Sequence, residues 1–529
     1  MSGANRREGW GTRVGVILAV TGSAVGLGNF LRFPGTAAEY GGAFMIPYVI
    51  ALLLLGLPIA WAEWAMGRYG GVRGFNSSPG IFRIICNRAK GAPYLGVLGL
   101  LVPVMIYTYY VFIEAWCLGY AYHYLAYGFG WDSSNPADQG FFGSFIGNNA
   151  DGELFMHPAH PTLVFLGICV VLNFVLIYRG ISKGIEWFAL RAMPLLVICA
   201  IIIVIRVLTL GTPDPDKPDL NVINALGYMW NPVYGGKSLW VSLQNAEMWL
   251  EAAGQIFFSL SVGFGVIITY SSYLKQRDDI ALSSTTAVAG NEWCEVALGG
   301  MMAIPAAFLF LGAEGAGGST FSLGFTSLPK VFLEMPAGWV FGFLFFFLLF
   351  FAAVTSSISM LQPAIAFLEE GLGLDRKGSV CLLGFVTIIG TAFVVYFSAD
   401  TKALASIDFW VGNFCIYVLA TIQVILFGWV LGLKKGFIEL DSGAELRIPR
   451  FVGFIIKYVS PVFLIVIFAV WVAQNFGKYV DQFQQDNIVR WSLMLIGLFL
   501  VFFVVLTMQA VKRWERQEQS ERAEGGASI

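Results

Sequence analysis

The chain has few charged residues for its length. Asp, Glu, Lys and Arg make up 12% of its 529 residues, against roughly 25% in an ordinary soluble domain. Hydrophobic residues make up 57% and aromatic residues 16%, which is more apolar surface than a soluble fold of this length can bury. The scarcity of charge therefore argues against intrinsic disorder and against a cytosolic enzyme, and it favours a polytopic membrane protein.

Cysteine and histidine are also scarce, and the chain has no large excess of positive or negative charge. The seven cysteines form no CxxC pair, the histidines number three, and the formal net charge is −2. This composition leaves little for a metal site of histidines and cysteines, and it argues against nucleic acid as a partner. The sequence has no Walker loop and no HExxH motif, so we expect no enzymatic activity.

Apolar segments of about 20 residues, the length that crosses a bilayer core, recur along the chain. We expect twelve membrane-spanning helices, which begin near residues 13, 43, 95, 163, 188, 241, 281, 337, 378, 403, 451 and 488. If the N-terminus lies inside, most of the 32 Lys and Arg residues fall in inside segments, as the positive-inside rule requires. The sequence thus predicts an all-α integral protein of the inner (plasma) membrane, with both termini in the cytoplasm.

Two of the expected spans contain glycine-rich stretches that resemble each other. Residues 22–28 read GSAVGLG in the first span, and residues 259–265 read SLSVGFG in the sixth. Paired interrupted helices are typical of an inverted repeat that builds a transport site, although glycine can also serve only to let helices pack closely. We predict two five-helix repeats, over 13–237 and 238–433, between a tail at 1–12 and a last region at 434–529.

Polar and ionisable side chains gather in these spans. Unwound carbonyls suit Na⁺ and helix N-termini suit a carboxylate, so an amino acid together with Na⁺ would satisfy both kinds of group. A single Ser or Thr can instead bond only to its own helix. Ionisable residues cost about 2.5–3.5 kcal/mol each at a membrane helix centre, so we expect each to be functional or paired. They are Arg32, Glu63, Glu114, Glu295 and Asp408.

The stretch GSAVGLGNFLRFP at residues 22–34 resembles the first-helix signature of the neurotransmitter:sodium symporter family, and most closely its bacterial amino-acid branch of the leucine-transporter (LeuT) type. The resemblance runs from about residue 6 to 515 and includes GGAFMIPY (41–48), EWAMGRYGG (63–71), RGISKGIE (179–186), GQIFFSLS (254–261) and TSS (355–357). It implies the LeuT-type fold, a five-plus-five inverted repeat of a twelve-helix protein with helices 1 and 6 unwound.

The resemblance also implies an activity. The expected function is Na⁺-coupled symport of a neutral amino acid with a hydrophobic side chain by alternating access, in a lipid bilayer. The alternative is a sensor on the same scaffold that binds the amino acid without transporting it. A homodimer is compatible with either function.

Family resemblance further assigns ligands for two Na⁺ ions and for the substrate. The first Na⁺ would be bound by Ala24, Asn29, Ser259 and Asn291. The second would be bound by Gly22, Val25, Ala352, Thr355 and Ser356. The substrate would contact Ser23, Ala24, Leu27, Gly28, Ile106, Tyr110, Phe258, Ser259, Ser261, Phe264, Ser356 and Met360.

Two gates are implied in the same way. The outer gate would pair Arg32 with Asp408 and would place Tyr110 against Phe258. The inner gate would pair Arg7 with Glu370, supported by Trp10, Ser272, Tyr273 and Gln362.

Two positions discriminate between branches of the family. Gly26 stands where the monoamine branch has Asp, so the substrate should bring its own carboxylate. Glu295 stands where chloride-dependent relatives have Ser, so its fixed charge should replace chloride and make transport chloride-independent.

Overall fold

The computed structural model describes residues 9–156, 160–236, 238–316 and 320–526, and within these ranges every regular element is helical. Ten helical segments are long and apolar enough to cross a membrane. They are Gly28–Gly71, Ala92–Gly128, Pro161–Tyr178, Ile181–Leu208, Ile280–Ala313, Gly338–Leu372, Arg376–Tyr396, Ala399–Asp441, Phe451–Gln485 and Asn487–Ser520.

The first expected span is broken near its middle. Helix α1 (Arg13–Ala24) starts at the N-cap Thr12, whose side chain accepts a hydrogen bond from the Gly15 N–H at 2.9 Å. The chain leaves the helical conformation at Val25, becomes helical again in Gly28–Arg32, and continues into α2 (Phe33–Tyr40).

The sixth span is broken as well. Helix α14 (Ala246–Leu260) ends before Ser261, and α15 (Val266–Ser272) begins five residues later. Gly263 and Gly265 have φ values of 75° and 83°, a conformation that glycine adopts without steric cost. These two interrupted helices complete twelve crossings with the ten longer segments, and the predicted fold class is confirmed.

The bounds of the other helices that position the site follow. They are α3 (Met45–Ala51), α4 (Leu57–Gly71), α7 (Leu98–Gly128), α10 (Pro161–Tyr178), α11 (Trp187–Leu208), α16 (Ile280–Glu292), α17 (Met301–Ala316), α20 (Gly338–Phe367), α21 (Arg376–Tyr396), α23 (Ile416–Ile425), α26 (Ser460–Gln485) and α27 (Asn487–Gly526). Helix α17 among them is kinked at Gly312.

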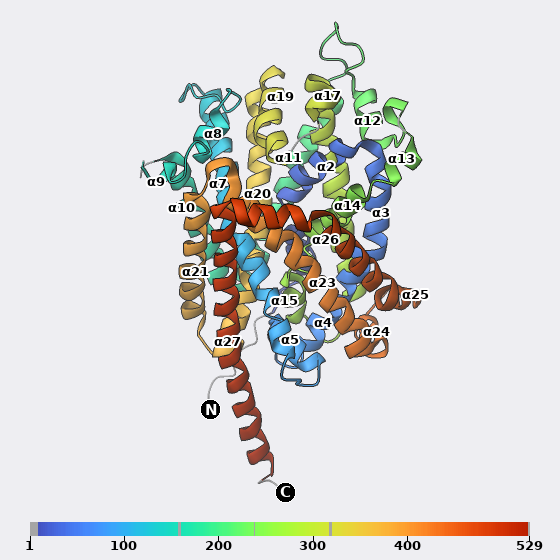
Figure 1. The fold of residues 1–529 in the computed structure, drawn as a ribbon, viewed down its shortest axis with the longest axis vertical. Coiled ribbons are helices and arrows are strands. Elements are labelled where there is room, and N and C mark those ends of the chain that lie inside the picture. Colours follow the sequence, from blue (N-terminus) through green and yellow to red (C-terminus); the bar gives the residue numbers. More distant parts are fainter. Residues whose placement is uncertain (1–8, 157–159, 237, 317–319, 527–529) are drawn as a thin grey trace.

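Shorter helices cover the two ends of the bundle (Figure 1). Helices α8 (Phe141–Ile146), α12 (Val222–Trp230), α13 (Leu239–Leu243) and α19 (Leu328–Glu334) lie at one end. Helices α5 (Ser78–Ile85) and α24 (Leu433–Asp441) lie at the other, where α27 extends beyond the bundle.

The outer faces of the bundle are apolar. Val171 on α10, Ile205 on α11 and Phe385 on α21 are 63%, 57% and 65% exposed. Apolar faces of this extent are not stable in water, and they match the hydrocarbon core of a bilayer. The protein is therefore an integral membrane protein.

Candidate functional site

The break in α1 leaves backbone amides without helical partners, and side chains accept their hydrogen bonds. The Gly26 N–H donates to Asn29 Oδ1 at 2.9 Å, and the Leu27 N–H donates to the Tyr110 hydroxyl at 3.0 Å. Buried amides need such partners. The break is thus held open by Asn29 from its own chain segment and by Tyr110 from α7.

The break in α14–α15 faces the break in α1. The hydroxyls of Ser261 and Ser356 both donate to the Ser23 carbonyl, each at 3.2 Å. The Gly263 N–H donates to Glu63 Oε1 at 2.8 Å. Helices α1, α20 and the sixth span therefore meet at one buried point, where the sequence predicts the substrate.

Three of the four residues predicted for the first Na⁺ ion form one hydrogen-bonded cluster, and the fourth, Ala24, was predicted to contribute its carbonyl. Asn29 Nδ2 lies 2.9 Å from Asn291 Oδ1 and 3.5 Å from Ser259 Oγ, and Asn291 Nδ2 donates to Ser259 Oγ at 2.6 Å. All three side chains are buried. Amide and hydroxyl oxygens are ligands that suit a hard cation, so this donor set fits Na⁺.

Glu295 lies against the same cluster. Its carboxylate accepts hydrogen bonds from Asn29 Nδ2 at 3.0 Å, from Gln255 Nε2 at 2.9 Å, from the Tyr48 hydroxyl at 2.8 Å, and from the Ser259 hydroxyl. The carboxylate is thus surrounded by hydrogen-bond donors, an environment that favours its negatively charged form.

Three further residues of this environment, Tyr48, Gln255 and Glu292, were not predicted from the sequence. The Tyr48 hydroxyl also lies 2.7 Å from Glu292 Oε2, so it contacts two carboxyl groups. Tyr48 lies in the motif GGAFMIPY and Gln255 lies in the motif GQIFFSLS. Their presence in these family motifs was the available signal.

The residues predicted for the second Na⁺ lie where α1 packs on α20. A Cβ placed on Gly22 would lie 3.4 Å from Cβ of Thr355, so the two helices are in close contact there. The Thr355 hydroxyl donates to the Ala352 carbonyl at 3.0 Å. Hydroxyls that donate to backbone carbonyls keep their lone pairs for a cation, and Val25 provides a further carbonyl at the break.

The predicted substrate pocket is lined by aromatic rings and by hydroxyls. The rings of Phe258 and Phe264 are 5.9 Å apart. A Cβ on Gly28 would lie 2.9 Å from the Phe258 ring, so the backbone there is in close contact with the ring. Ile106 and Met360 are buried.

One pocket residue was missed by the sequence analysis. The Ser23 hydroxyl donates to Ser359 Oγ at 2.7 Å, which places Ser359 directly behind a predicted substrate contact. Its position one helical turn after Ser356 was the available signal.

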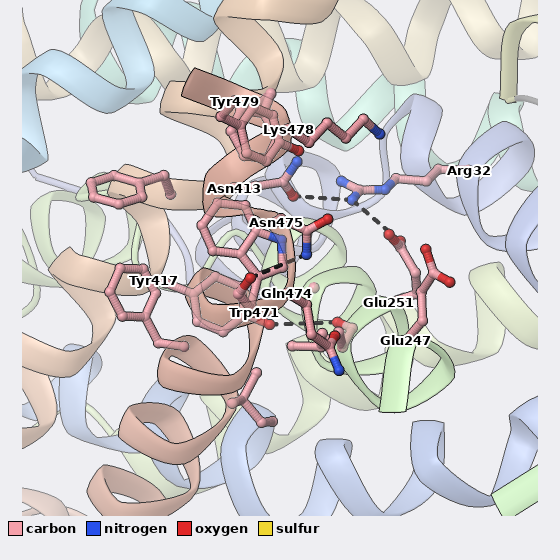
Figure 2. A pocket seen from close by; sticks show the side chains of 16 residues that line it. Arg32, Glu247, Glu251, Asn413, Tyr417, Trp471, Gln474, Asn475, Lys478 and Tyr479 are labelled. Carbon is pink, nitrogen blue, oxygen red and sulfur yellow. Dashed lines mark hydrogen bonds and ion pairs between the residues drawn. The ribbon is translucent and has the colours of Figure 1, made fainter. Parts of the chain in front are cut away.

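The structure shows no direct ion pair between Arg32 and Asp408, both of which lie in its described part. Arg32 Nη2 lies 3.2 Å from Asn413 Oδ1 and 4.0 Å from Glu251 Oε2 (Figure 2). Asp408 instead accepts a hydrogen bond from the Tyr109 hydroxyl at 2.5 Å. As an outer gate, the Arg32–Asp408 pair stays a prediction.

Arg32 lines a cavity of about 450 Å³ (Figure 2). Its guanidinium lies 5.0 Å from the Phe258 ring centre, a distance at which a cation is attracted to the ring. The cavity is lined on its other sides by α14, by residues 409–417 and by α26. Arg32 therefore contacts both this cavity and Phe258, a residue of the predicted substrate pocket.

The inner-gate residues lie together at the opposite end. Trp10 Nε1 donates to the Tyr270 carbonyl at 3.0 Å, and Gln362 Nε2 donates to the Tyr273 hydroxyl at 3.0 Å. Glu370 accepts a hydrogen bond from the Ser77 hydroxyl. Arg7 lies outside the described residues.

Ser272, the remaining residue of the predicted inner gate, contacts the loop before α5. Its hydroxyl donates to Asn76 Oδ1 at 3.1 Å and to the Thr269 carbonyl at 2.6 Å.

A second set of contacts holds the start of α1 and was not predicted. The Glu186 carboxylate, 3% exposed, accepts hydrogen bonds from the Gly11 N–H at 2.7 Å, the Thr12 N–H at 3.0 Å and the Thr12 hydroxyl at 2.9 Å. Glu186 closes the RGISKGIE motif, which the sequence analysis quoted without assigning a role to this residue.

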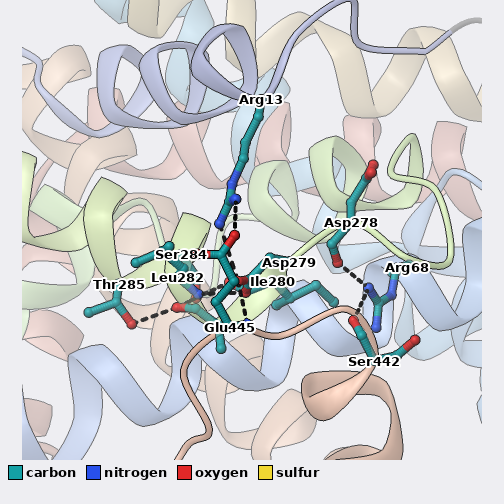
Figure 3. A network of polar contacts seen from close by, with 11 residues as sticks. Arg13, Arg68, Asp278, Asp279, Ile280, Leu282, Ser284, Thr285, Ser442 and Glu445 are labelled. Carbon is teal, nitrogen blue, oxygen red and sulfur yellow. Dashed lines mark hydrogen bonds and ion pairs between the residues drawn. The ribbon is translucent and has the colours of Figure 1, made fainter.

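Ion pairs hold the same end of α1 from another side. Arg13 pairs with Asp279 at 3.2 Å and with Glu445 at 3.1 Å (Figure 3). The buried Arg68 pairs with Glu439 at 3.2 Å, and its guanidinium also donates to the Asp278 carbonyl at 2.5 Å (Figure 3). The N-terminal end of α1 is therefore fixed to three separate parts of the chain.

Comparisons with known proteins point to one family. The family model described as "Sodium:neurotransmitter symporter family" matches residues 7–140 and 160–514. An uncharacterized sodium-dependent transporter of Methanocaldococcus jannaschii is 26% identical over 96% of this chain and 99% of its own. Another, of Haemophilus influenzae, is 30% identical over 88% of this chain and 98% of its own.

A solved structure is similar over most of the chain. The crystal structure of MhsT in complex with L-phenylalanine superposes with a TM-score of 0.72 and 27% identity, over 88% of this chain and 99% of MhsT.

Proposed function

The chain belongs to the sodium:neurotransmitter symporter family, and we propose that it imports a neutral amino acid together with Na⁺ by alternating access. The observation that carries the proposal is the meeting of the two broken helices, where Ser261 and Ser356 both bond to the Ser23 carbonyl. A buried polar chamber between broken helices offers carbonyls to cations and amides to a carboxylate.

Recognition of a carboxylate on the substrate follows from Gly26. A Cβ there would lie 2.7 Å from the Tyr110 hydroxyl and 2.8 Å from Ser356 Oγ, so the position has no room for a side chain. The Leu27 N–H and the Tyr110 hydroxyl lie beside it. A substrate carboxylate would bind these two groups, and its ammonium would meet the carbonyls of Ala24 and Phe258.

Hydrophobic substrates are favoured by the side-chain end of the pocket. Phe258, Phe264, Ile106 and Met360 supply apolar surface there. The complex of the related MhsT with L-phenylalanine supports the same class of ligand for this chain.

Two Na⁺ ions would drive the import. A tenfold Na⁺ gradient is worth about 1.4 kcal/mol per ion, and a potential of about 100 mV adds about 2.3 kcal/mol per charge. Two ions would supply about 7 kcal/mol, enough for a substrate gradient on the order of 10⁵. Glu295 would supply the negative charge beside the first ion, so that chloride is not required.

The orientation and assembly of the protein complete the proposal. The bias of Lys and Arg toward one side supports an orientation with both termini in the cytoplasm. The inner end of α1, with Arg13 and Glu186, would then face the cytoplasm, and the cavity beside Arg32 would face outward. We include a homodimer as compatible with this arrangement.

The proposal is tested by uptake of labelled amino acids into vesicles that contain the purified protein. The expected result is concentrative uptake with an inward Na⁺ gradient, no uptake when K⁺ replaces Na⁺, and no requirement for chloride. Na⁺-dependent binding without accumulation would identify a sensor instead. Equal uptake with Na⁺ and K⁺ would refute the proposal.

A further inference from the structure

Glu114 is a buried carboxyl group that the proposed transport cycle does not use. It lies in the middle of α7, one helical turn after Tyr110, and its exposure is 0%. An ionisable residue at this depth is costly unless it is paired or functional. The role of Glu114 therefore has to be found in its contacts.

Every hydrogen-bonding partner of Glu114 is able to donate. The Ser357 hydroxyl lies 2.5 Å from Oε2, and Asn173 Nδ2 lies 3.1 and 3.3 Å from the two carboxylate oxygens. The thiol of Cys169 is a further hydrogen-bonding neighbour. Donors directed at both oxygens are the environment of an ionised carboxylate. Among the described residues, no Lys, Arg or His forms an ion pair with it.

Ser357, which donates to this carboxylate, lies on the same turn of α20 as two ligands predicted for the second Na⁺ ion. Thr355 and Ser356, the two side-chain ligands predicted there, directly precede Ser357 on α20. The other predicted ligands of that ion, from Gly22, Val25 and Ala352, are backbone carbonyls. The second site thus has only neutral oxygens, whereas the first has Glu295 and the substrate carboxylate beside it.

We propose that Glu114 provides the negative charge that balances the second Na⁺ ion, and that Ser357 fixes the carboxylate next to the ligands on α20. Glu114 is a positioning and charge-balancing residue in this proposal, not a ligand of the ion. A charge in the buried interior is weakly screened, so it acts on a cation beyond the first coordination sphere. The proposal rests on the proposed function, because it takes the second Na⁺ site from there.

The test first removes the negative charge of Glu114 and then restores a negative charge at a neighbouring position. In Glu114→Gln the carboxylate becomes a neutral group of the same size. In the double variant Glu114→Gln with Asn173→Asp the carboxylate is restored on α10, within the same cluster. Each full-length protein is purified, and its thermal stability is measured against NaCl concentration at constant ionic strength, without amino acid, so that the substrate carboxylate does not contribute. Na⁺ dependence of amino-acid uptake is measured in parallel.

We expect Glu114→Gln to raise the Na⁺ concentration for half-maximal stabilisation and uptake about tenfold, and the double variant to return it to within about threefold of the wild type. Ser357→Ala should raise it in the same direction by about threefold. Thr387→Ala is the matched control, since that buried hydroxyl on α21 bonds to the backbone of its own helix at 2.9 and 3.1 Å.

Three results would overturn the proposal. The first is an unchanged Na⁺ requirement in Glu114→Gln. The second is a loss of stability of the same size with and without Na⁺, which would show a structural role only. The third, which decides the matter if Glu114→Gln does not fold, is a Na⁺ requirement of Ser357→Ala equal to that of Thr387→Ala. Absence of Na⁺ dependence in the wild-type protein would instead refute the proposed function.

Discussion

Glu186 should control how firmly the start of α1 is held at the inner end. In Glu186→Gln one carboxylate oxygen becomes an NH₂ group, which cannot accept from the Gly11 N–H or from Thr12. Hydrogen bonds to charged groups contribute about 1.5–3 kcal/mol each. The substitution should therefore weaken the attachment of this segment by about 2–3 kcal/mol, which corresponds to about 30- to 150-fold in the population of the released segment.

Amide hydrogen exchange measures this population directly, because the amides of Gly11 and Thr12 are themselves the donors. The protein is placed in lipid nanodiscs with Na⁺, and exchange is followed in peptides that cover residues 9–16. We expect exchange at these amides to accelerate by about 30-fold or more.

The matched control is Glu153→Gln, which loses hydrogen bonds to Asn149 at the opposite end. It should leave exchange in residues 9–16 unchanged. Equal exchange in Glu186→Gln and the wild type would show that Glu186 does not hold α1, and the reasoning would be refuted.

Three other substitutions test separate parts of the site. Glu295→Ser leaves buried donors without an acceptor and removes a negative charge. The attraction of that charge for a cation about 4 Å away is about 4 kcal/mol at a dielectric constant of about 20. Uptake without chloride should therefore fall at least about 100-fold, and added chloride should restore it. Gly26→Ala would place a methyl group 2.7 Å from the Tyr110 hydroxyl, so the KM for the amino acid should rise at least about tenfold; an unchanged KM would contradict the carboxylate assignment. Trp514→Ala removes a buried ring packed 5.3 Å from Phe75; the loss of about 3–5 kcal/mol should lower the melting temperature and speed tryptic cleavage within α27.

The helix breaks could be predicted because their signal is local. Glycine in the stretches 22–28 and 259–265 allows backbone conformations that a helix does not use, and the structure has its breaks at Val25 and from Ser261 to Gly265. Hydrophobic length predicted both spans but not their interruption, which leaves α1 with twelve residues and α14 with fifteen. The pairing of the two motifs, rather than their hydropathy, predicted the site.

Partners of charged side chains could not be predicted in the same way. Glu186 and Thr12 lie 174 residues apart in sequence, and Arg13 and Glu445 lie 432 apart. Local pattern says nothing about such contacts. The partners of Arg32 could not be predicted either, because the rotamer of a long side chain determines which acceptor it reaches. It contacts Glu251 and Asn413, and Tyr109 donates to Asp408.

The proposed Na⁺ ions would account for buried carboxylates that have no cationic side chain as a partner. Glu63, Glu114, Glu292 and Glu295 form no ion pair with any described Lys, Arg or His. Donors such as Tyr48 and Ser357 stabilise the negative charge without cancelling it. A fixed lysine or arginine would cancel the charge permanently and would compete with Na⁺ for it. In the proposed arrangement, leaving Glu114 and Glu295 without a cationic partner would let each carboxylate attract a Na⁺ ion and would couple that ion to the helix that carries the acid.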